Sequence, residues 1–235
     1  MKGFSFHNGV EYRISIEGER WTQGSAVELE VATRAGQPVL VTLAEGNERK
    51  IKAKDPEAFT GIDSREGTGP SFKARFELPV NVRITDKSGS LYLLYGDPGK
   101  LANLKLSIDP HPWFGEICDL LVRHYRFSLK STIMGKKGKV ELKLEPSGAK
   151  EWASLTHLFV LLSLEKDSLE LTLEFHRTVV NALKPGLVAE KASGSFHRSL
   201  PLAGIVHDFN QRLNSDAVVA SLDSLIEEYR SRGWL

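Results

Sequence analysis

The sequence predicts a mainly β protein built from two antiparallel β-sandwich domains. A short helix is expected at the start of the second domain and another helix at the C-terminus. Three observations support this. Apolar and polar residues alternate over many short runs, a proline-containing elbow interrupts the runs near the middle, and the pattern after residue 201 becomes helical. Strict alternation is typical of strands with one buried face.

The first half of the chain, from residue 4 to 108, is a series of short runs typical of strands, several of which alternate strictly. They cover 10–16, 27–31, 39–43, 72–78 and 91–95, and turns rich in Gly, Pro or Asp separate them. Short strands at this spacing favour an antiparallel sandwich over a parallel sheet. The stretch 55–70, rich in Gly, Asp and Glu, predicts a loop with little packing.

The elbow at residues 108–125 predicts the first helix. Asp109 is expected to cap a helix that starts after Pro112. Apolar side chains and one imidazole then recur at steps of three and four residues: Phe114, Ile117, Leu120, Leu121 and His124. A helix this short is marginal alone in water, so we expect it to dock on one of the β units.

Alternation resumes in the second half, at 125–130, 140–145 and 169–176, with a more continuously apolar run at 159–164. The predicted domains are therefore an N-terminal sandwich over 1–108, a C-terminal sandwich over 109–200 that opens with the helix, and a helical extension over 201–235. The two sandwiches are expected to share one architecture.

The helical extension contains the strongest helix signals in the chain. Asn214, Ser215 and Asp216 supply capping side chains and a first-turn carboxylate, and Gly233 suits the end of the helix. One face is apolar: Val218, Leu222, Leu225, Ile226 and Tyr229. This face either covers a groove of its own chain or binds a partner, so these five residues are the candidate partner-binding site.

Composition limits the classes of partner and compartment. The 31 Lys and Arg residues balance 30 Asp and Glu residues, which argues against nucleic acid and anionic lipid as partners. The cluster Lys136–Lys139 is interpreted as a hairpin turn.

A single cysteine suits a reducing compartment, and the first 15 residues lack a signal-peptide pattern. The longest nearly apolar stretch, 155–164, is too short to span a bilayer. We expect a soluble, cytoplasmic protein.

No motif in the sequence indicates catalysis. None of the seven histidines lies at zincin spacing from another, and the P-loop, G-x-S-x-G and G-x-G-x-x-G patterns are absent. Cys118 and His124, six residues apart on a helix, point in different directions. His176-Arg177 and His197-Arg198 are interpreted as polar strand positions. We therefore expect no enzyme activity, no cofactor and no metal, and we assign no catalytic residue.

One alternative of a different class stays open: a β-sandwich carbohydrate-binding module or glycoside-active enzyme. Glu170 and Glu174 could supply its paired carboxylates. Convergence of Trp152, His176 and Glu174 on one pocket would favour this alternative. The four tryptophans are spread along the sequence, so packing in the core or at its rim is the preferred interpretation for them.

The segments at 108–129, 139–146 and 171–177 resemble the arrestin-like sporulation-control (SpoOM) family. The stretch 12–31, with Gly24-Ser25 before a strand, is similar to the start of an arrestin domain. The chain departs from the family pattern at 191–194, where Lys-Ala-Ser-Gly stands in place of an acidic run. The resemblance implies two arrestin-type sandwiches and a non-enzymatic regulatory or adaptor protein, without assigning any functional residue.

Together these observations predict a non-enzymatic cytoplasmic scaffold that binds protein partners through strand edges, a groove between the domains or the terminal helix. Open strand edges can recruit an extended peptide. They can also pair two copies of one chain, so a homodimer stays open. The sequence does not identify the partner. No nucleic-acid partner and no integral membrane segment are expected.

Overall fold

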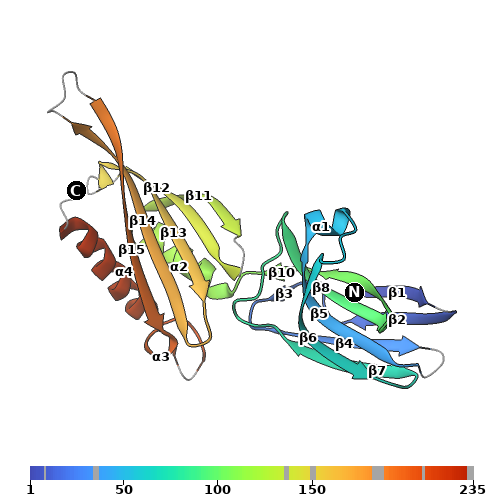
Figure 1. Ribbon diagram of the computed structural model, residues 1–235. Coiled ribbons are helices and arrows are strands. Elements are labelled where there is room, and N and C mark those ends of the chain that lie inside the picture. The colour runs from blue at the N-terminus through green and yellow to red at the C-terminus, as the bar shows by residue number, and fades with distance from the viewer. Residues whose placement is uncertain are drawn as a thin grey trace. The chain divides into compact units, whose positions relative to one another are not determined.

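The computed structural model describes residues 1–7, 9–33, 37–134, 138–148, 152–181, 188–207 and 210–231. The chain forms two compact units. The first comprises Met1–Pro110 with Lys136–Gly138, and the second comprises His111–Gly135 with Lys139–Leu235. Antiparallel strands dominate the chain (Figure 1), and a C-terminal helix is present, so the prediction of a mainly β, antiparallel fold with a C-terminal helix is confirmed.

Two antiparallel sheets form the first unit. In the described residues, one sheet has the order β1-β2-β4-β7 and the other has the order β6-β5-β8-β9. Their strands are β1 (Lys2–His7), β2 (Val10–Ile16), β4 (Ala26–Thr33), β7 (Ser71–Glu77), β6 (Phe59–Gly67), β5 (Val39–Asn47), β8 (Gly89–Asp97) and β9 (Lys100–Leu106). Strands β3 (Trp21–Thr22) and β10 (Ile108–Asp109) pair in parallel, and helix α1 covers Glu48–Lys52.

The core of the first unit lies between its two sheets. Val27 and Phe76 from one sheet and Leu43, Leu91 and Leu93 from the other are completely buried. These residues occupy alternate positions of their strands, as the sequence predicts. Burying each such side chain contributes about 1.5–3 kcal/mol before entropy costs.

The prediction of a loop over 55–70 is wrong for most of that stretch. Strand β6 runs through it and pairs with β5 from Val39↔Gly67 to Gly46↔Phe59. Most side chains of β6 are exposed, because the strand lies at the edge of its sheet. Its polar composition therefore reflects an edge position, where backbone pairing is retained without burial.

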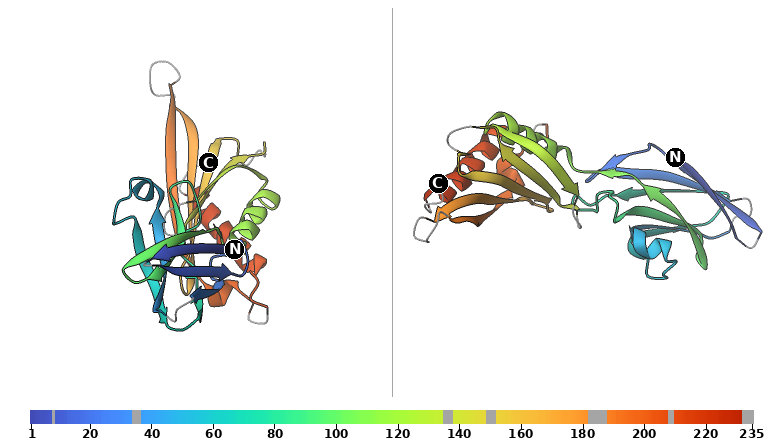
Figure 2. Two further views of the ribbon diagram at one scale, coloured as in Figure 1. Left: turned by 90° about the vertical axis from the view of Figure 1, so that its right-hand side faces the viewer. Right: turned by 90° about the horizontal axis from the view of Figure 1, so that it is seen from above.

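The second unit is a single antiparallel sheet with helices on one face. The strand order in the described residues is β11-β12-β13-β14-β15. These strands are β11 (Phe127–Met134), β12 (Val140–Pro146), β13 (Leu155–Leu164), β14 (Ser168–Asn181) and β15 (Val188–Pro201). Helices α2 (Pro112–Arg123) and α4 (Ser215–Tyr229) supply the second layer (Figure 2), and α3 (Leu202–Ile205) follows β15. The two units thus differ in what covers the sheet: a second sheet in the first unit and helices in the second. The expectation that both domains share one architecture is therefore wrong.

Helix α2 begins after Pro112 as predicted, but its cap is different. His111 is the N-cap, and its ring nitrogen accepts from the Trp113 backbone N–H at 3.4 Å. Asp109, the expected cap, lies in β10 and binds the guanidinium of Arg20. That ion pair lowers the pKa of the Asp109 carboxyl.

Two predictions about the helix ends have different outcomes. The Asn214 side chain caps α4 by accepting from the Ala217 backbone N–H at 3.2 Å, which confirms the predicted helix start. Gly233, the predicted stop, lies outside the described residues, as do Lys136 and Lys137 of the predicted turn and Trp234.

Candidate functional site

Strand β1 is an open edge that presents two phenylalanines. It pairs with β2, from Lys2↔Ser15 to His7↔Val10, and is terminal in the order of its sheet. Phe4 is 72% exposed and Phe6 is 63% exposed, and their rings meet edge to face at 6.2 Å. Large apolar side chains placed together on an open edge are uncommon, because natural edges are usually protected by charge or proline.

The residue at position 3 explains why these rings point outward. A Cβ added to Gly3 would lie 2.9 Å from Tyr95 Oη and 3.2 Å from Ile14 Cγ2, so this face of β1 lies against the core. Because strand side chains alternate, Lys2, Phe4 and Phe6 take the outer face. The α-amino group of Met1 donates to the carbonyl of Ile16 at 2.7 Å and anchors the start of the strand.

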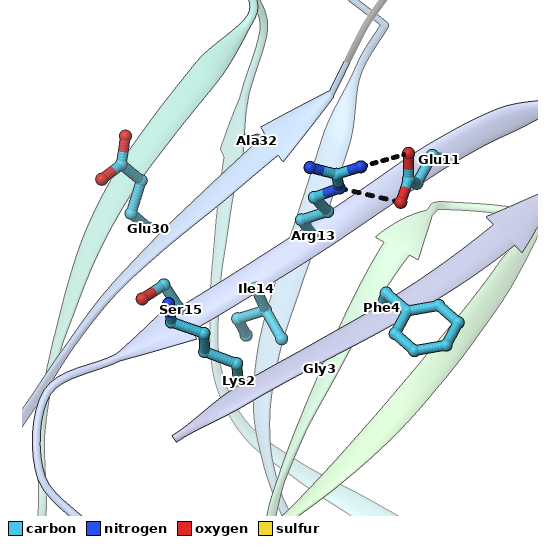
Figure 3. Close-up of a pocket in the computed structure, with 9 residues that line it drawn as sticks. All are labelled: Lys2, Gly3, Phe4, Glu11, Arg13, Ile14, Ser15, Glu30 and Ala32. Atoms are coloured by element: carbon cyan, nitrogen blue, oxygen red, sulfur yellow. Dashed lines mark hydrogen bonds and ion pairs between the residues drawn. The ribbon is translucent and has the colours of Figure 1, made fainter.

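A hollow of about 610 Å³ lies beside Phe4 on the outer face of this sheet. Small side chains, Ser15 and Ala32, contribute to its lining (Figure 3). The complete lining is Lys2, Gly3, Phe4, Glu11, Arg13, Ile14, Ser15, Glu30 and Ala32. The hollow therefore crosses strands β1, β2 and β4 and offers an aromatic wall at the open edge.

Most charged residues around the hollow make polar contacts within the sheet. Arg13 donates to both carboxylate oxygens of Glu11, at 2.8 and 3.1 Å (Figure 3), which raises the pKa of the guanidinium. Glu30 accepts from the hydroxyl of Ser71. Among the charged residues that line the hollow, Lys2 alone has no hydrogen bond or ion pair with the described residues.

The opposite edge of the same sheet, strand β7, has a different surface. Its outward side chains include Lys73, Arg75 and Glu77, all exposed. Arg75 binds Glu77 at 2.7 Å and reaches Glu28 of β4 at 3.0 Å. One edge of the sheet is thus covered with charged side chains, which protect an edge from pairing, whereas the other edge carries two exposed aromatic rings.

The five apolar residues predicted on the terminal helix lie on the covered side of α4. Val218, Leu222, Leu225, Ile226 and Tyr229 are all at most 3% exposed. The Tyr229 ring stacks on Phe175 of β14 at 3.9 Å. Tyr125 donates to Asp223 at 2.9 Å, which adds a polar contact to the packing. A partner would reach these five side chains only if α4 left the sheet.

Residues considered for chemistry do not converge. Trp152 packs against Phe127 and Phe175 on the helix-covered face of the second sheet. Glu174 and His176 alternate with Phe175 and so face the other side, where they bind each other at 2.7 Å. Glu170 and Glu174 lie four strand residues apart, which is about 13 Å along the backbone. Carboxyl groups of glycosidases are roughly 5–9.5 Å apart.

The remaining candidates also lack a shared site. Burial raises the pKa of the Cys118 thiol, and His124 lies at the end of α2 in an edge-to-face contact with Tyr125. The two His-Arg dipeptides lie on neighbouring strands without facing each other, because His176 is opposite Ser193 and His197 is opposite Thr172.

One polar network on the open face of the second sheet was not predicted. Glu170 accepts from the hydroxyls of Ser168 and Ser199, both at 2.6 Å, and these bonds lower the pKa of its carboxyl. His197 bridges Glu170 at 3.1 Å and Thr172 at 3.0 Å. Every member lies on β14 or β15, so the network holds these two strands together across an exposed face.

Within the described residues, no group of three or more His, Cys, Asp or Glu side chains is placed to hold a metal ion. None of the described helices is both long and apolar enough to cross a membrane.

Comparisons with known proteins give matches among solved structures but none among family profiles or curated sequences. Among solved structures, the chain is similar to Spo0M, a sporulation control protein from Bacillus subtilis. The identity is 17%, the match covers 79% of this chain and 90% of that chain, and the TM-score is 0.49. At this identity no residue role is transferred from that protein to this chain.

Proposed function

We propose that this protein is a non-enzymatic scaffold or adaptor that binds a protein partner by adding an extended segment of that partner to strand β1. The observation that carries the proposal is the pair of exposed rings, Phe4 and Phe6, on an edge that pairs on one side only. Strand addition uses the free backbone groups of such an edge for affinity, and pockets for alternate side chains for selectivity.

The surroundings of β1 fit this role. The outer face of the sheet is open around Phe4, with a hollow over β1, β2 and β4, so the exposed ring has no covering element on that face in the described residues. A partner that covers the two aromatic rings stabilises the complex, because each Å² of buried apolar area contributes about 25 cal/mol. The residues 1–108 would act as the binding domain, and 109–200 with the extension 201–235 as a second domain, all within the cytoplasm.

The test is affinity capture from lysate of cells that contain the protein. Full-length protein, the double variant Phe4→Ser/Phe6→Ser and the control Ile62→Ser are compared. Ile62 is a matched control because it is 40% exposed on β6, an edge strand of the other sheet. We expect the same bound proteins with the original chain and with Ile62→Ser, and their loss with the double variant. Capture of an unchanged set by the double variant would overturn the proposal.

A further inference from the structure

The outward side chains of β1 also indicate which kind of partner segment can pair with this strand. We infer that the added segment is an extended, acidic and aliphatic strand that runs antiparallel to β1. Aliphatic side chains lie opposite Phe4 and Phe6, and a carboxylate lies opposite Lys2. This inference rests on the proposed function and names the class of partner for the same edge.

The register follows from sheet geometry. The sheet is antiparallel, and β1 itself pairs antiparallel with β2. Directly opposed residues of antiparallel strands place their side chains on the same face, with Cβ atoms about 4.5–5.5 Å apart. Residues opposite Lys2, Phe4 and Phe6 therefore have their side chains on the outer face of the sheet. Read from its N-terminus, the segment has the pattern aliphatic-x-aliphatic-x-acidic.

The apolar positions follow from the contacts of the rings. Phe4 and Phe6 already contact each other edge to face, and more than half of each side chain is exposed. Pairs of an aromatic and a β-branched residue across strands are favourable on such a face. Valine, isoleucine and threonine also suit an added strand because they favour extended backbone.

The acidic position follows from charge complementarity. Arg13 is neutralised by two bonds to Glu11, and Glu30 accepts from Ser71, whereas Lys2 has no partner among the described residues. A carboxylate opposite Lys2 adds an attractive pair, and a basic side chain there adds repulsion. Because this pair is exposed, its effect is modest and falls with added salt.

The experiment measures binding of two labelled peptides to the full chain by fluorescence anisotropy. Both peptides contain the core Thr-Val-Thr-Val-Thr-X, where X is Glu in one and Lys in the other. The variants are Lys2→Glu, the double variant Phe4→Ser/Phe6→Ser, and Lys73→Glu. Lys73 is a matched control because it is an exposed lysine on the outer face of β7, the opposite edge strand of the same sheet.

We expect the original chain to bind the Glu peptide roughly two- to fivefold more tightly than the Lys peptide. Lys2→Glu should reverse this order, while Lys73→Glu should leave it unchanged. The double variant should lose at least about tenfold in affinity for both peptides.

The other outcomes separate the inference from the proposed function. If the double variant loses both peptides but Lys2→Glu does not change their order, the acidic position is wrong and strand addition at β1 stands. If the double variant binds both peptides as well as the original chain does, β1 is not the binding edge and both proposals fail. If neither peptide binds the original chain, the inference fails, and the lysate capture decides the proposed function. A dimer in sedimentation that disappears in the double variant identifies a second copy as the occupant and also overturns the inference.

Discussion

Helix α4 and strand β1 each carry a row of apolar side chains, yet these rows lie in opposite environments. On α4, Leu222, Leu225 and Tyr229 are completely buried against their own unit. On β1, Phe4 and Phe6 are mostly exposed. Apolar periodicity therefore identifies a face of an element, but the rest of the fold decides whether that face is covered. A covered face contributes to stability, and an open one remains for a partner.

The largest expected effect comes from placing a charge on the covered face of α4. Leu225→Asp should lower the free energy of unfolding of the second unit by at least about 3–5 kcal/mol. It removes a buried side chain and places a carboxylate among apolar groups. Urea unfolding followed by far-ultraviolet circular dichroism measures the change.

Ala220→Asp is the matched control, because Ala220 lies on the exposed side of the same helix. It should change stability by less than about 0.5 kcal/mol. Equal stability of Leu225→Asp and Ala220→Asp would show that α4 does not pack on its own sheet in solution. The five predicted partner-binding residues would then be available to a partner.

An intermediate effect is expected at the start of α4. Asn214→Ala removes the side chain that accepts from the Ala217 N–H, and loss of such a cap costs about 1 kcal/mol. Asn214→Asp retains an accepting oxygen and should keep most of the stability. Thermal unfolding of the three proteins measures the difference. A melting temperature that is the same for the alanine variant and the original chain would mean that the cap adds nothing to the docked helix.

Much of the fold was predictable because its elements have strong periodicity. The alternation over 10–16 and the helical pattern after Asn214 correspond to β2 and α4. Strand β6 was not predictable from alternation, because a strand at a sheet edge keeps its backbone pairing without an apolar face. The cap of α2 was missed because pairing of β10 with β3 holds Asp109 in an extended strand, away from the helix start.

The candidate site was the least predictable feature. Lys2, Phe4 and Phe6 alternate with Gly3 and Ser5, and hydropathy alone would place the rings in the core. The close approach of Tyr95 and Ile14 to Gly3 decides which face of the strand lies inward, because only a residue without a side chain fits at position 3. The sequence shows small residues alternating with large ones along β1, but this alternation does not indicate which of the two sets is buried. That choice depends on β8, about 90 residues away in the sequence.

The smallest expected effect on stability is at the open edge, where the largest effect on binding is proposed. Phe4→Ser/Phe6→Ser should change the free energy of unfolding of the first unit by less than about 1 kcal/mol, because both rings are mostly in water already. Phe76→Ser is the control in the same sheet. Phe76 is completely buried, and its loss should cost about 3–5 kcal/mol. Urea titration of the three proteins measures both values. A loss in the double variant that approaches that of Phe76→Ser would mean that the β1 rings belong to the core in solution, and β1 would no longer be an edge held open for a partner.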